Sequence, residues 1–173
     1  MQQFNFIQNL QEWSNQYPWL EMITSFSIVI FLAILANFVA KQVIVRGIRK
    51  LISKTAFANN DIITQYSVIQ RIANIVPALV IMNGISTVPH LSDKVENFVQ
   101  MVTQAFIFLT IALAISEFLN IFNLIYQRNP KSRNKPIKGY LQLVKLIIYV
   151  VCVLMIIGTF LDKDVFTLLA GFG

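Results

Sequence analysis

The chain has 173 residues, of which 56% are apolar and only 13% charged, and its formal net charge is +6. Soluble domains carry about 25% charged residues, so this composition excludes an ordinary soluble fold. With one Cys and one His, the chain cannot build a disulfide framework or a Cys/His zinc site. No nucleophile–base pair or phosphate-binding loop is apparent, so we expect neither an enzyme nor a cofactor.

Long apolar runs follow one another along the chain, and each is long enough to cross the hydrocarbon core as a helix. A further apolar run begins at residue 165. We therefore predict an all-α membrane protein, with residues 1–164 forming a membrane region of four transmembrane helices and residues 165–173 beginning a fifth. The predicted spans cover residues 22–40, 72–88, 98–126 and 146–161.

The basic residues are divided very unequally between the connecting segments. Six of the 14 Lys and Arg residues lie in residues 41–71 and six in residues 128–145, which leaves only Lys94 and Lys163 for the other side. Short cytoplasmic loops retain Lys and Arg during insertion, so both basic loops are expected inside and the N-terminus outside. No aromatic platform is interleaved with these charges, so we do not expect nucleic acid as a partner.

The first span is predicted to continue into the inner interface as an amphipathic helix. Apolar residues recur there at spacings of three and four, with basic residues between them. Basic residues at this depth are attracted to anionic lipid headgroups. Membrane lipids are therefore the expected partners, and the expected headgroup anchors are Lys41, Arg46, Arg49, Lys50 and Lys54.

Two features inside the spans predict specific local structure. Pro77 lies within the second span, where the loss of one backbone donor should kink the helix. Glu117 is flanked by apolar residues on both sides, and an acid in that position should find a partner, lose its charge or face water. Lys145 lies at a similar depth on the next, antiparallel span, so we predict an intramembrane Glu117–Lys145 pair.

Small residues on two spans predict close helix packing. Ala33, Ala36 and Ala40 form such a patch on the first span, and Ala112 and Ser116 belong to a similar one on the third. Close backbone approach is what stabilises helix pairs in lipid. These patches therefore predict helix–helix contacts.

A family resemblance rests on two segments at the C-terminal end of the chain. The first is Lys-Pro-Ile-Lys-Gly-Tyr-Leu-Gln-Leu-Val-Lys at residues 135–145, and the second is Phe-Thr-Leu-Leu-Ala-Gly-Phe-Gly at residues 166–173. Together they resemble the small-conductance mechanosensitive channel superfamily (MscS-like), in its miniconductance branch with extra N-terminal helices. In topology the resemblance covers the whole chain.

This resemblance implies the N-terminal, membrane-sensing region of a channel that releases ions and osmolytes in hypo-osmotic stress. It also implies a homo-oligomer, usually a heptamer, in a bacterial inner membrane. The pore helix would begin with Ala170, Gly171 and Gly173, and the chain is expected to be truncated before the rest of it. A small four-helix transporter using Glu117, or a non-transporting membrane scaffold, stays open as an alternative.

Overall fold

The computed structural model describes residues 18–52, 67–128, 137–161 and 170–171. Nearly all of these residues are helical, and none of them lies in a strand. The elements are α2 (Pro18–Ile52), α3 (Ser67–Ala73), α4 (Ile75–Gly84), the short 3₁₀ helix η1 (Ile85–Thr87), α5 (Asp93–Arg128) and α6 (Lys138–Leu161).

Four stretches of helix are long and apolar enough to cross a membrane, which confirms the predicted all-α membrane fold. The chain is therefore a multi-pass membrane protein. The helices extend beyond the predicted apolar runs because their polar flanks are also helical. For example, α2 has 35 residues, so it is about 53 Å long and exceeds the roughly 30 Å hydrocarbon core. The four stretches are Pro18–Ile44, Val68–Thr87, Asp93–Leu124 and Lys138–Leu161.

The second span is not one continuous helix, because α3 and α4 are separated at Asn74. Pro77 lies three residues further on, in the first turn of α4. Proline has no N–H to donate to the carbonyl of Ala73, and its ring crowds that carbonyl. The Asn74 N–H is shared between the carbonyls of Gln70 and Arg71, each at 3.1 Å.

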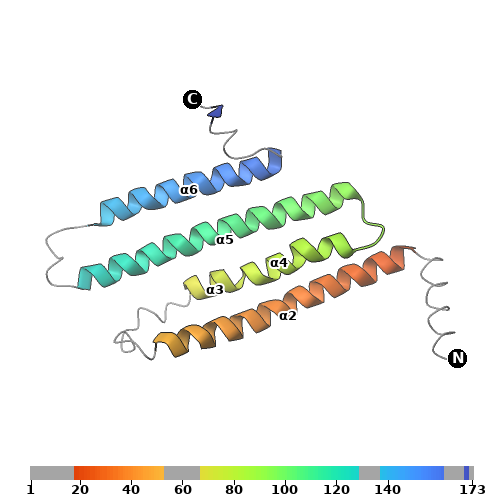
Figure 1. The fold of residues 1–173 in the computed structure, drawn as a ribbon, viewed down its shortest axis with the longest axis horizontal. Helices are drawn as coiled ribbons and strands as arrows, with labels where there is room; N and C mark the ends of the chain where they lie inside the picture. Colours follow the sequence, from red (N-terminus) through yellow and green to blue (C-terminus); the bar gives the residue numbers. More distant parts are fainter. Residues whose placement is uncertain (1–17, 53–66, 129–136, 162–169, 172–173) are drawn as a thin grey trace.

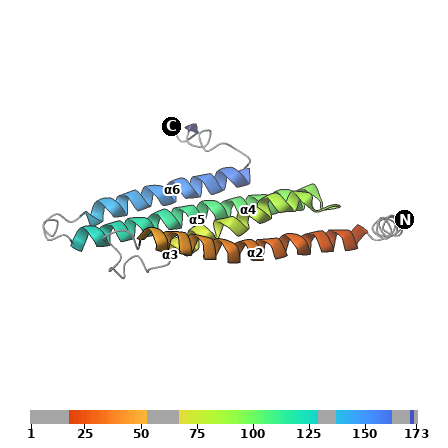
Figure 2. The same cartoon turned by 60° about the horizontal axis from the view of Figure 1, so that its bottom comes forward.

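The helices lie in a row in the order of the chain. α2 contacts α3, α4 and η1, α5 contacts α3, α4, η1 and α6, and α6 contacts α5 alone among the described elements. In both views α2 and α6 lie at opposite edges of this row, and successive spans run in opposite directions (Figure 1, Figure 2). The described helices therefore form an open layer and do not enclose a common core.

The pattern of buried residues along α5 agrees with its position in the middle of the row. One buried face carries Thr103, Ile107 and Thr110, whereas Ala112 and Ser116 are also buried. Ile107 and Ser116 are nine residues apart, which at about 3.6 residues per turn places them on opposite sides of the helix. The helix is thus buried on two opposite faces, as a member in the middle of a row must be.

The predicted contacts between small residues are confirmed on both helices. Ala33 and Ala40 are buried on α2, and Ala112 and Ser116 are buried on α5. Large apolar side chains on the remaining faces, such as Phe31 and Phe38 of α2, are mostly exposed. Exposed apolar surface of this extent suits contact with lipid and would be costly in water.

α2 and the second span approach each other closely around Val29 of α2. Val29, Ile85 and Val88 form a buried apolar cluster there. A Cβ atom added to Gly84 would lie 2.9 Å from Cγ1 of Val29, which is closer than such atoms approach in proteins. Gly84 is therefore required by close helix packing.

Candidate functional site

A chain of hydrogen bonds joins α5 to α6 near the start of α6. The ammonium group of Lys145 donates a hydrogen bond to Oδ1 of Asn120. The amide nitrogen of Asn120 in turn donates to Oε2 of Glu117 at 3.2 Å. We call these three residues the polar relay, because a neutral amide connects a base on α6 to an acid on α5.

The structure brings Glu117 and Lys145 to the same level of two facing helices but does not place them in direct contact. Asn120 lies between them and uses both of its polar atoms, one toward each charge. Asn120 was not among the residues predicted from the sequence. Its spacing of three from Glu117 was the available signal, because residues three apart share one face of a helix.

A second hydrogen bond joins the same two helices at the next level. The hydroxyl of Tyr149 donates to Oγ of Ser116 at 2.8 Å, and Ser116 is buried. Residue numbers rise along α6 from Lys145 to Tyr149 as they fall along α5 from Asn120 to Ser116, as expected for antiparallel helices. The α5–α6 interface is therefore hydrogen-bonded at two successive levels, a device that stabilises helix pairs in lipid.

A cavity of about 130 Å³ opens beside the polar relay. Residues of α5 and α6 line it, and they include two lysines and three side-chain amides but no carboxylate. The lining residues are Leu119, Asn120, Asn123, Lys138, Leu141, Gln142 and Lys145. A second, larger and mostly apolar cavity of about 500 Å³ lies between α2 and α4, beside Val29 and Gly84.

The predicted headgroup anchors lie toward the C-terminal end of α2. Lys41 and Arg46 are both exposed, and the Arg46 guanidinium donates to the side-chain oxygen of Gln42 at 2.8 Å. Arg49 and Lys50 belong to the last turns of α2, but their side chains lie outside the described part of the chain, as does Lys54 entirely.

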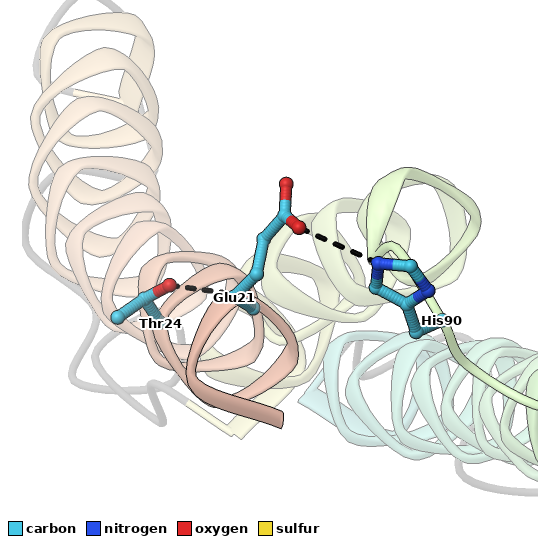
Figure 3. Close-up of polar contacts among 3 residues, drawn as sticks. All are labelled: Glu21, Thr24 and His90. Carbon is cyan, nitrogen blue, oxygen red and sulfur yellow. Dashed lines mark hydrogen bonds and ion pairs between the residues drawn. The ribbon is translucent and has the colours of Figure 1, made fainter. Parts of the chain in front are cut away.

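At the opposite ends of the helices, the turn between η1 and α5 contacts the start of α2. Nε2 of His90 lies 3.4 Å from Oε2 of Glu21, a contact that is ionic only when the imidazole is protonated (Figure 3). The hydroxyl of Thr24 donates to the backbone carbonyl of Glu21 at 3.0 Å. His90 follows Pro89 and has a positive φ of 59°, a conformation that turns accept more readily than helices do.

The expected beginning of a pore helix is described at only two positions. Ala170 is helical and exposed, and Gly171 lies in a turn, whereas Gly173 is outside the described residues. Within the described ranges, no three His, Cys, Asp or Glu side chains gather as metal ligands would.

Comparisons with known proteins add no relative to this description. No family model, no curated protein and no solved structure matches the chain. Function is therefore inferred from the arrangement of the helices and their polar residues.

Proposed function

We propose that this chain is the membrane-sensing region of a mechanosensitive channel, which releases ions and osmolytes when hypo-osmotic stress stretches the membrane. The observation that carries the proposal is the open row of helices. Because α2 contacts only the second span and α6 contacts only α5 within the described part, each outer helix presents most of its circumference to lipid.

Tension acts on a membrane protein through the area that the protein occupies. A conformation with a larger area is favoured by an energy equal to the tension multiplied by the area difference. A closed bundle resists such a change through its shared core, whereas a row can widen by loosening one contact. The junction between α2 and α4 already contains the 500 Å³ apolar cavity, so it is the place where we expect the row to widen.

The proposed orientation has the N-terminus outside and the basic loops in the cytoplasm of a bacterial inner membrane. In this orientation Lys41 and Arg46, which are exposed, anchor α2 at the inner headgroups. Ala170 and Gly171 would lead into the pore helix, and the complete channel would be a homo-oligomer, with seven copies by the family resemblance. These assignments extend the resemblance carried by residues 135–145 and 166–173.

The experiment measures whether the row widens under tension. Val43 on α2 and Leu143 on α6 are exposed and suit fluorophore attachment through introduced cysteines, in a Cys152→Ser background. In liposomes swollen by osmotic downshift, energy transfer between the two labels should fall. A control pair at Phe122 and Leu143 spans only the hydrogen-bonded α5–α6 contact and should change little. Unchanged transfer for the Val43–Leu143 pair across the range of downshifts would refute tension sensing.

A small transporter is the second candidate, because the cavity beside the polar relay could accept a solute and Glu117 could couple its movement to protons. Glu117→Gln separates the two functions. A transporter would lose solute uptake into proteoliposomes, whereas a tension sensor would keep its response to swelling.

A further inference from the structure

The cavity beside the polar relay has the chemistry of an anion site. Lys138 and Lys145 supply two ammonium groups, and Asn120, Asn123 and Gln142 supply amides, while no carboxylate lines the space. Glu117 lies outside the lining and is already bonded to the Asn120 amide. The walls therefore carry a formal charge of +2, with no negative charge to balance it inside the cavity.

Many of the donors in this cavity are unused. Lys145 commits one of its three N–H bonds to Asn120, and the side chains of Lys138 and Gln142 form no hydrogen bond within the described part of the chain. The oxygen of Asn123 accepts a bond from Gln127 at 3.3 Å, which leaves the Asn123 N–H₂ group free to donate. A phosphate group, which offers several acceptor oxygens and negative charge, matches this donor set.

The size and surroundings of the cavity identify the kind of phosphate. Its volume of about 130 Å³ is far below the roughly 300–1,000 Å³ typical of small-molecule pockets, so only a headgroup-sized part of a ligand can enter. Further along α6, a stripe of exposed apolar side chains, Leu146, Val153 and Ile157, lies to one side of the helix face that lines the cavity. A ligand with a compact anionic head and long apolar chains satisfies both surfaces at once.

We propose that this cavity binds the phosphate of an anionic phospholipid, whose acyl chains then lie along the exposed face of α6. Lys138 and Lys145 contact the phosphate, and the polar relay holds the Lys145 ammonium in position. Basic pockets between membrane helices recognise headgroups in this way. The site needs only the α5–α6 pair, so it does not depend on the proposed channel function.

Native mass spectrometry of the detergent-purified protein, titrated with phosphatidylglycerol, tests the site. Lys138→Gln should weaken binding roughly fivefold, and Lys138→Gln with Lys145→Gln roughly 25-fold, from about 1 kcal/mol per basic residue. Lys94→Gln is the matched control, because Lys94 is also an exposed lysine in the first turn of a helix but lies at the N-terminal end of α5, far along the helix from the cavity. It should leave the affinity unchanged.

Lys138→Gln keeps the test decisive even if the double variant fails to fold, because the Lys138 side chain is exposed and forms no hydrogen bond with the described residues. Phosphatidylcholine should bind more weakly than phosphatidylglycerol, and inorganic phosphate should displace little lipid. An equal loss of affinity in Lys41→Gln would indicate diffuse attraction to the basic end and overturn the proposal. Inorganic phosphate binding as tightly as the lipid would also overturn it, in favour of a site for a free anion.

Discussion

The two outermost helix contacts of the row are built in opposite ways. α2 packs on η1 and the end of α4 through an apolar cluster, Val29, Ile85 and Val88, with Gly84 allowing the close approach. α6 packs on α5 through hydrogen bonds at two levels. In lipid the hydrophobic effect does not drive helices together, so packing shape and polar bonds are the available means. The first contact depends on volume, and the second depends on donors and acceptors.

The largest effect is expected where shape alone holds the helices. Gly84→Leu forces a side chain into the space occupied by Val29, and overpacking of this kind costs about 1–3 kcal/mol of the free energy of unfolding. Steric-trapping unfolding in bicelles measures it. Gly139→Leu is the control, because a Cβ atom at Gly139 meets nothing within 4 Å.

Shortening the Val29 side chain should relieve the steric clash that any Cβ atom at position 84 creates. Gly84→Ala combined with Val29→Ala should be more stable than the sum of the two single changes predicts. Additive costs would mean that Gly84 and Val29 do not determine the approach of the helices.

The next effect concerns the polar relay. Asn120→Leu removes the amide between Glu117 and Lys145, and we expect a loss of about 1–2 kcal/mol in the same unfolding measurement. Asn97→Leu, at an exposed position of α5, should change stability little. A stability equal to that of the parent protein would show that the relay contributes nothing.

Exchanging the charges of Glu117 and Lys145 is a second test of the polar relay. In Glu117→Lys with Lys145→Glu, the Asn120 amide can turn over and serve both reversed partners, because it has a donor and an acceptor. The exchanged protein should be more stable than either single variant. If it is as unstable as the singles, then Asn120 does not mediate between the two charges.

A smaller effect is expected one level deeper. Tyr149→Phe removes only the hydroxyl that donates to Ser116, and interhelical hydrogen bonds in membranes average about 0.6 kcal/mol. Tyr140→Phe removes the same hydroxyl from an exposed tyrosine without a hydrogen bond among the described residues, and should be neutral. Equal effects of the two changes would contradict a specific Tyr149–Ser116 bond.

The smallest effect is expected at the contact between His90 and Glu21, because the His90 side chain is exposed and the Glu21 side chain is partly exposed. Exposed ion pairs contribute between zero and about 1 kcal/mol, so Glu21→Gln should shift the unfolding free energy by less than that.

His90→Gly should be more stable than His90→Ala, because glycine accepts the positive φ without steric cost. The reverse order would show that the turn is not strained.

The sequence predicts the helices well because their signal is local. Each span is a long and mostly apolar run, and the small residues that become buried, such as Ala33 and Ala112, mark the contact faces. The open row was not predictable from the sequence. Large apolar residues occur on all faces of each span, so they do not distinguish the side that faces lipid from the side that contacts another helix. The relay was only partly predictable, since the level of Glu117 and Lys145 follows from counting along the helices, whereas Asn120 requires knowledge of which faces meet.

The row also has a consequence for how the protein is made. Contacts between its described elements join only spans that are consecutive in the chain. Each helix leaving the ribosome therefore meets its final neighbour already in the membrane, and no early span has to wait for a distant one. Structures dominated by such local contacts assemble quickly. We expect the spans to pair stepwise during synthesis, so that damage to the α5–α6 contact leaves an earlier α2–α4 pair intact.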